Sequence, residues 1–248
     1  MARSKVKTAY VCQECGAEHA KWQGQCNSCD AWNSLSQVNI SPIVGGAAAH
    51  NALGFAGATA EIKKLAEVEA LETARIGSGF AELDRVLGGG FVPGSVVLIG
   101  GDPGAGKSTL LLQACTKLAA KQGVLYVTGE ESLQQLALRA QRLKLPMDGL
   151  NVAAETRAEV IANHIATQKP QVVVLDSVQV LQMEGVDSTP GSVTQVRETA
   201  AFFTRLAKQQ DVVIILVGHI TKEGGLAGPK VLEHMIDCFM MLDSPAGS

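Results

Sequence analysis

Residues 96–109 read VVLIGGDPGAGKST, an apolar run followed by a glycine-rich loop that ends in Lys-Ser-Thr. The loop matches the pattern G-x-x-x-x-G-K-[ST] between a predicted strand and a predicted helix. In this pattern the glycines let backbone N–H groups surround phosphate oxygens, and the helix adds its positive N-terminal end. The stretch therefore predicts an α/β fold that binds a nucleoside triphosphate, which we expect to be ATP with Mg²⁺.

Each residue of the loop has a predicted place around the nucleotide. The predicted contacts are Gly101, Asp102, Pro103, Gly104, Ala105, Gly106, Lys107, Ser108 and Thr109. Lys107 is predicted to reach the β- and γ-phosphates and to act in hydrolysis, Ser108 to bind Mg²⁺, and Thr109 to lie near the α-phosphate. The alternative is a glycine-rich turn without a ligand, in which case Lys107→Ala would leave turnover unchanged.

Apolar runs alternate with amphipathic stretches around this loop. We expect strands at 96–99, 124–127, near Val152, 172–175, 212–217 and 238–242, and helices at 108–120, 132–143, 157–168 and 192–209. Near-continuous Val/Ile/Leu strands between helices are typical of a parallel sheet that is covered on both faces. The predicted fold is therefore an α/β domain with a mainly parallel sheet.

Polar residues follow three of these apolar runs. Asp176 ends the run VVVLD, at the sheet edge where open α/β folds bind ligands, and is predicted to contact Mg²⁺; the alternative is a helix cap. Glu130 is predicted to orient or deprotonate the attacking water, although acidic residues there also favour a helix start. His219 is a candidate sensor of the γ-phosphate, or a histidine with a structural role only.

Four of the six cysteines form two Cys-x-x-Cys pairs near the N-terminus. The pairs are Cys12, Cys15, Cys26 and Cys29. Each pair fits two vertices of a tetrahedron, which predicts a structural Zn²⁺ site filled by four sulfurs. We expect Trp22 and Trp32 to pack this small unit and His19 to lie at its surface. Two disulfides or a redox dithiol are the alternatives.

Composition and motifs together divide the chain into three regions. We expect a zinc-binding domain at 1–35, a flexible linker at 36–75 with one short helix at 61–71, and an ATPase domain at 76–248. A net charge of -3 gives no bulk attraction to nucleic acid. Because neither a signal core nor a membrane-spanning apolar run is found, we expect a cytoplasmic protein with no membrane partner.

Taken together, these motifs resemble the bacterial RadA (Sms) family of DNA repair and recombination proteins, which are RecA-like ATPases. Besides the motifs above, the resemblance rests on residues 22–26, 79–90, 126–132, 190–200, 217–219 and 228–234, and it covers essentially the whole chain. It implies a RecA-like P-loop core in a hexameric ring, a DNA-dependent ATPase that promotes branch migration of recombination intermediates. The implied partners are single-stranded DNA, branched intermediates, further copies of the chain, and a replicative helicase or recombinase.

The resemblance also implies where DNA would lie. Residues 183–191 and 220–228 align with the two central loops that face DNA in RecA-like rings, and Lys222 and Lys230 are the candidate phosphate contacts. For each lysine the alternative is an ordinary exposed surface position.

Two further functions are weighed against this one. Family members continue into a Lys-Asn-Arg-Phe-Gly motif and a Lon-protease-like domain, which this sequence lacks, so we expect a C-terminally incomplete ATPase domain. The chain would then be a nucleotide-binding or helicase-recruiting module with little turnover. A KaiC-like regulatory ATPase is the other alternative, because residues 79–90 followed by a phosphate loop also occur there.

Overall fold

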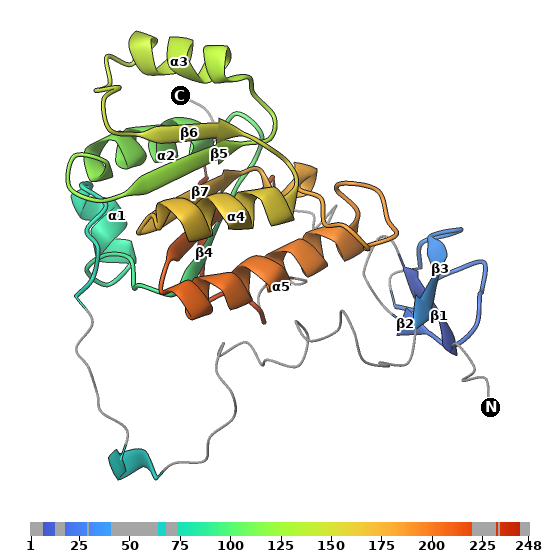
Figure 1. The fold of residues 1–248 in the computed structure, drawn as a ribbon. Coiled ribbons are helices and arrows are strands. Elements are labelled where there is room, and N and C mark those ends of the chain that lie inside the picture. Colours follow the sequence, from blue (N-terminus) through green and yellow to red (C-terminus); the bar gives the residue numbers. More distant parts are fainter. Residues whose placement is uncertain are drawn as a thin grey trace.

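The computed structural model describes residues 7–12, 18–28, 30–40, 64–67, 74–219, 232 and 234–243. The residues between 7 and 40 form a small antiparallel sheet, here called the N-terminal unit. The residues from 74 onward form an α/β domain, here called the body domain (Figure 1). Between them, the described residues 64–67 contain one turn of 3-10 helix, Leu65–Glu67, where a longer helix at 61–71 was expected.

The N-terminal unit is a three-stranded sheet with strand order β2-β1-β3. Its strands are β1 (Lys7–Cys12), β2 (Glu18–His19) and β3 (Leu35–Ile40). β3 pairs with β1 along its whole length, so that Ile40 lies opposite Lys7. The sheet therefore runs past residue 35, which we expected to end this domain, because the pairing of β1 requires all of β3.

A few buried side chains hold the N-terminal unit together. Cys12, Cys26 and Leu35 form its core, and the half-buried Tyr10 packs against them. Trp22 and Trp32 are 57% and 70% exposed, so the expectation that they pack this unit is wrong. Among the described residues, the interior is instead formed by the two cysteines and Leu35.

The body domain is built on six parallel strands in the order β6-β5-β7-β8-β4-β9. The strands are β4 (Val96–Gly100), β5 (Val124–Thr128), β6 (Asn151–Ala154), β7 (Val172–Asp176), β8 (Val213–Val217) and β9 (Cys238–Met241). Every residue of β4, β5 and β8 is buried. The predicted parallel α/β fold is confirmed.

The described residues of the body domain contain five α-helices and a 3-10 turn, of which α1 precedes β4 and the others lie between strands. They are α1 (Ala81–Val86), α2 (Lys107–Leu118), α3 (Leu133–Arg142), α4 (Ala158–Gln168), the turn η3 (Val178–Val180) and α5 (Val193–Gln210). α3 begins at Ser132, whose side chain and that of Gln135 form a reciprocal capping box. Among the described residues, none of the helices combines the length and apolarity that a bilayer crossing requires.

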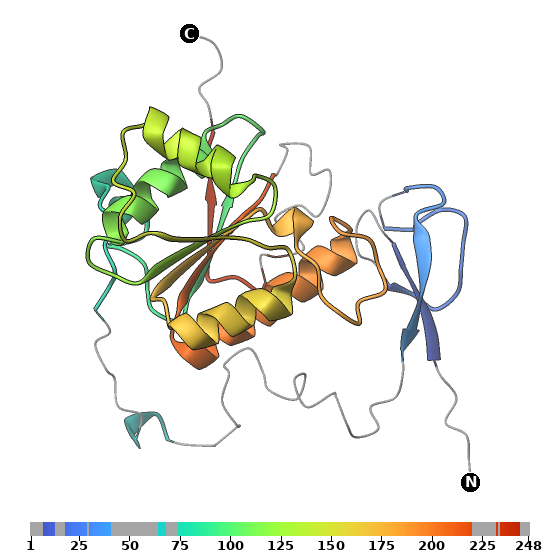
Figure 2. The same ribbon diagram turned by 45° about the horizontal axis from the view of Figure 1, so that its top comes forward.

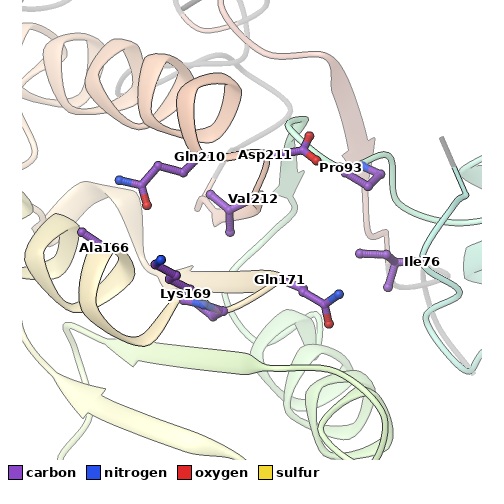
Figure 3. A pocket seen from close by; sticks show the side chains of 9 residues that line it. Ile76, Pro93, Ala166, Lys169, Gln171, Gln210, Asp211 and Val212 are labelled. Carbon is purple, nitrogen blue, oxygen red and sulfur yellow. The ribbon is translucent and has the colours of Figure 1, made fainter. Parts of the chain in front are cut away.

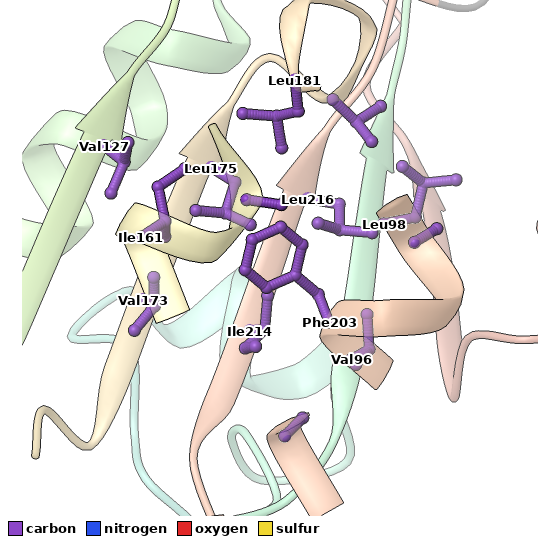
Figure 4. Close-up of a cluster of buried hydrophobic side chains, with 14 of the residues drawn as sticks. Val96, Leu98, Val127, Ile161, Val173, Leu175, Leu181, Phe203, Ile214 and Leu216 are labelled. Carbon is purple, nitrogen blue, oxygen red and sulfur yellow. The ribbon is translucent and has the colours of Figure 1, made fainter. Parts of the chain in front are cut away.

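The sheet separates two hydrophobic cores. Alternate strand residues face opposite sides, so Leu98 packs toward α4 and α5, whereas Val97 packs toward α2 and α3. Figure 2 shows α4 and α5 lying together over one face of the sheet. Phe203 of α5 fills the centre of that core against strand residues of β4, β7 and β8 (Figure 4). Helices on both faces leave the carboxyl edge, where the strands end, as the place for a site.

Candidate functional site

The glycine-rich loop joins β4 to α2 at the carboxyl edge. Gly104 and Gly106 have φ angles of 84° and 88°, and a Cβ on either would meet no heavy atom within 4 Å. Both residues therefore adopt the left-handed conformation that favours glycine beside open space. No side chain caps the N-terminus of α2, so the N–H groups of its first turn are free to bind an anion. This arrangement fits the phosphates of a nucleotide.

Lys107 begins α2 and is buried, with only 4% of its surface exposed. Its Nζ donates to the carbonyl oxygens of Gly101 at 2.7 Å and Asp102 at 2.9 Å. Burial lowers the pKa of Lys107, while the nearby carboxylates of Asp176, Asp102 and Glu130 oppose that change. The ammonium group thus lies within electrostatic reach of both predicted acidic residues. Ser108 and Thr109 follow in the first turn of α2 and are half-buried.

Asp176 is the last residue of β7, and its side chain accepts a hydrogen bond from a buried residue of the adjacent strand β5. The hydroxyl of Tyr126 in β5 donates to its Oδ2 at 2.5 Å. Burial raises the pKa of Tyr126 well above its ordinary value, and the negative charge of Asp176 raises it further. Tyr126 was not predicted from the sequence, where the available signal was a single hydroxyl in an otherwise aliphatic predicted strand.

Glu130 lies at the end of β5 among side chains from two other strands. Its Oε1 accepts a hydrogen bond from the Ser177 hydroxyl and lies 3.4 Å from Nε2 of His219. The adjacent Glu131 points elsewhere, because it forms an ion pair with Arg139 of α3. Of the two acidic residues, Glu130 is therefore the one that faces the ends of β7 and β8.

His219 follows β8 and is held by a residue that was not predicted from the sequence. Gln179 of η3 donates from its Nε2 to the backbone carbonyl of His219 at 3.3 Å. In the described part of the chain, the buried Nδ1 of His219 has no hydrogen-bond partner. A buried ring nitrogen without a partner at this edge is consistent with a polar ligand nearby.

The two expected DNA loops differ in how much the structure describes. In the segment 183–191, the buried side chain of Gln195 accepts from the Met183 N–H and donates to the Ser188 carbonyl, each at 3.4 Å. Gln195 therefore anchors this segment to the start of α5. The segment 220–228 and both candidate lysines, Lys222 and Lys230, lie outside the described residues.

A large cavity lies at the opposite edge of the sheet. Its volume is about 520 Å³, and it is lined by residues that precede β4, β7 and β8, among them Pro93, Gln171 and Val212 (Figure 3). Because these residues stand at the amino ends of the strands, the cavity is remote from Lys107 and Asp176. It is therefore separate from the candidate nucleotide site.

Two of the four cysteines predicted to bind zinc lie within the described residues. The backbone N–H of Ser28 donates to Sγ of Cys26 at 3.4 Å, and Nε2 of the half-buried His19 lies 3.4 Å from the same sulfur. Sγ of Cys12 lies 3.2 Å from the Ser34 hydroxyl. Cys15 and Cys29 lie outside the described residues, which by themselves contain no group of three or more metal-binding side chains. The N–H of Ser28 directed at the Cys26 sulfur suits a thiolate that binds a metal.

Two protein-family models match this chain. A model of the AAA domain family matches residues 62–225, and a model of the rubredoxin metal binding domain family matches residues 10–37. Among solved structures, one described as an ATPase domain has a TM-score of 0.58 and 18% identity, covering 68% of this chain and 76% of that one. That likeness concerns the fold alone.

Curated relatives share the name DNA repair protein RadA. The protein from Haemophilus influenzae is 56% identical over 245 residues, which cover 98% of this chain and 53% of the relative. The Escherichia coli protein is 55% identical over 246 residues, with the same shares of the two chains covered. The more distant Bacillus subtilis protein is 43% identical over 244 residues, covering 97% and 52%. The chain thus spans about half the length of these relatives, and the resemblance inferred from its motifs is confirmed.

Proposed function

The chain belongs to the AAA domain family and is similar to RadA DNA repair proteins over almost its whole length, and we propose that it is a DNA-dependent ATPase of DNA repair. The observation that carries the proposal is the surroundings of Lys107. Its buried ammonium lies near two carboxylates, Asp176 and Glu130, that come from the ends of two other strands. A cation and two acids at one open sheet edge suit a phosphoryl-transfer site.

In this proposal the chain's own residues have distinct tasks around ATP. Mg²⁺, when bound, would supply positive charge that offsets the negative charge of the phosphates. Ser108 and Asp176 would hold the ion, and the Lys107 ammonium would stabilise charge on the transferred phosphoryl group. Glu130 would take a proton from the attacking water through its carboxylate. His219, adjacent to Glu130, would respond to the γ-phosphate.

The DNA part of the proposal rests on the names of the relatives. We infer that single-stranded DNA and branched recombination intermediates are the partners, and that the chain promotes branch migration together with further copies of itself. Because the chain carries a net charge of -3, binding must depend on local lysines such as Lys222 and Lys230. A replicative helicase or recombinase would be a further partner, and such work would take place in the cytoplasm.

ATP hydrolysis with and without single-stranded DNA tests this function. We expect DNA to raise the turnover rate severalfold and the stimulation to fall steeply as salt increases, because phosphate contacts release counterions. The variant Lys169→Ala removes a lysine at the opposite edge of the sheet, and its ATP hydrolysis should still be fully stimulated by DNA. Tight ATP binding without turnover would favour a helicase-recruiting module, and phosphorylation of the chain itself would favour a KaiC-like regulator.

We also propose that the N-terminal unit holds one structural Zn²⁺ through Cys12, Cys15, Cys26 and Cys29. Elemental analysis of protein purified without chelator should find about one zinc per chain, as expected for a four-cysteine site. Cys26→Ser should remove the zinc and leave ATP binding intact, because the body domain has its own cores. Cys238→Ser, a half-buried cysteine of β9, should retain the metal. Zinc retained in Cys26→Ser would contradict the site.

A further inference from the structure

Tyr126 is the one residue of β5 between 124 and 127 that carries a polar group. It is fully buried, and its ring packs in the core beneath α2, among residues that include Leu111 and Cys115. Its partner directly across on β7 is Val174, which offers only apolar contact. A phenylalanine would satisfy the same packing, so the hydroxyl needs a separate explanation.

The Tyr126 hydroxyl forms a hydrogen bond with a residue of the proposed nucleotide site, Asp176. β5 and β7 are parallel, and Thr128 lies opposite Asp176. Tyr126 precedes Thr128 by two residues, so it lies two positions closer to the amino ends of the strands. Its ring spans the gap, and Oη donates to Oδ2 of Asp176 at 2.5 Å. A hydrogen bond to Oδ2 restricts the rotation of the carboxylate, and Oδ1 is then the oxygen that a ligand could use.

We propose that Tyr126 is a positioning residue for Mg²⁺, whose hydroxyl holds the Asp176 carboxylate in the orientation that receives the magnesium–nucleotide complex. The inference rests on the proposed function, since Asp176 is a magnesium contact only if the site binds Mg²⁺ and ATP. Carboxylates that bind metals are themselves commonly hydrogen-bonded, and loss of such a partner typically lowers metal affinity or activity about 10- to 100-fold. The buried hydroxyl of Tyr126 is the hydrogen-bond donor that supports the Asp176 carboxylate in this way.

A positioning role and a purely structural role predict different measurements. If the hydrogen bond of the hydroxyl contributes only to the stability of the fold, its removal would change the stability. The magnesium dependence of nucleotide binding would then stay as it was. If it orients Asp176, its removal would shift the magnesium dependence and leave magnesium-free binding unchanged. Tyr126→Phe separates the two because it deletes one oxygen and keeps the ring.

The experiment is equilibrium binding of a fluorescent ATP analogue to the whole chain, titrated with Mg²⁺. For Tyr126→Phe we expect the Mg²⁺ concentration at half-maximal binding to rise about tenfold, with unchanged binding in excess chelator. Asp176→Asn should shift the curve at least as far, and the double variant no further, because both changes remove the same interaction. Tyr10→Phe, which alters the other tyrosine of the chain, is the matched control and should bind as wild type.

The outcomes distinguish this inference from the function on which it rests. An unshifted curve for Tyr126→Phe beside a shifted one for Asp176→Asn would overturn the role of Tyr126 and leave the proposed function intact. Unshifted curves for both variants would overturn the magnesium assignment of Asp176, and the inference with it. A wild-type chain that bound no nucleotide would overturn the proposed function as a whole.

A second measurement does not depend on the folding of Tyr126→Phe. In the Tyr10→Phe chain, Tyr126 is the sole remaining tyrosine, so fluorotyrosine labelling places one fluorine label beside Asp176. We expect its fluorine resonance to move when Mg²⁺ is added with ATP, and to stay in place when Asp176 is also replaced by asparagine. A resonance indifferent to Mg²⁺ in the Tyr10→Phe chain would overturn the inference.

Discussion

Replacing Lys107 by alanine is expected to lower ATP hydrolysis by about 100- to 1,000-fold, the usual loss when one preorganised charge-stabilising group is removed from an active site. Lys107 is the buried cation of the phosphate loop, and its Nζ lies beside the loop carbonyls of Gly101 and Asp102. Without it, the charge that develops on the transferred phosphoryl group would lose the stabilisation that the Lys107 ammonium is proposed to give. The measurement is phosphate release at saturating ATP.

The controls for this variant separate chemistry from folding. Because Lys107→Ala also removes the hydrogen bonds to the carbonyls of Gly101 and Asp102, its melting temperature is measured beside its activity. Lys121→Ala removes an exposed lysine just beyond α2 and should keep full activity. Undiminished turnover in Lys107→Ala would show that hydrolysis takes place elsewhere.

Glu130→Gln is expected to reduce hydrolysis about 100-fold or more while ATP affinity stays close to that of wild type. The amide keeps the shape of the side chain and an oxygen that can accept the hydrogen bond from Ser177. It cannot take a proton from water, so the loss should fall on turnover and not on binding. Single-turnover hydrolysis together with equilibrium ATP binding measures the two effects separately.

The neighbouring residue provides the matched control for Glu130. Glu131→Gln makes the same chemical change one position along the chain, but Glu131 is paired with Arg139 and directed toward α3. We expect this variant to hydrolyse ATP nearly as wild type does. If instead Glu131→Gln lost turnover and Glu130→Gln kept it, the general-base assignment would pass to Glu131.

Much of the body domain could be predicted because its central strands, β4, β5, β7 and β8, are buried on both faces. β7 was expected at 172–175 and spans Val172–Asp176, since a parallel strand between two helical layers is a continuous apolar run. α1 was missed because it has six residues and no side-chain cap at its N-terminus. The sheet of the N-terminal unit was missed because β1 and β3 are distant in sequence, and no local pattern reveals their pairing.

The candidate site could be predicted residue by residue but not as a network. Position after an apolar strand makes Asp176 and Glu130 candidates, yet the acidic residues at 130 and 131 both follow the same strand. The choice between them depends on contacts between different strands, such as Ser177 with Glu130, 47 residues apart in the chain. Tyr126 was overlooked for the same reason, because its partner lies 50 residues away on the adjacent strand.

The most direct test of a magnesium–ATP site at the carboxyl edge is calorimetric titration of the chain with ATP in the presence of Mg²⁺. We expect one ATP to bind per chain with a Kd between about 1 μM and 1 mM, the range of typical enzyme affinities for substrate. Binding should weaken strongly in Lys107→Ala and remain unchanged in Lys121→Ala. A wild-type chain that bound ATP no more tightly than Lys107→Ala would contradict the site.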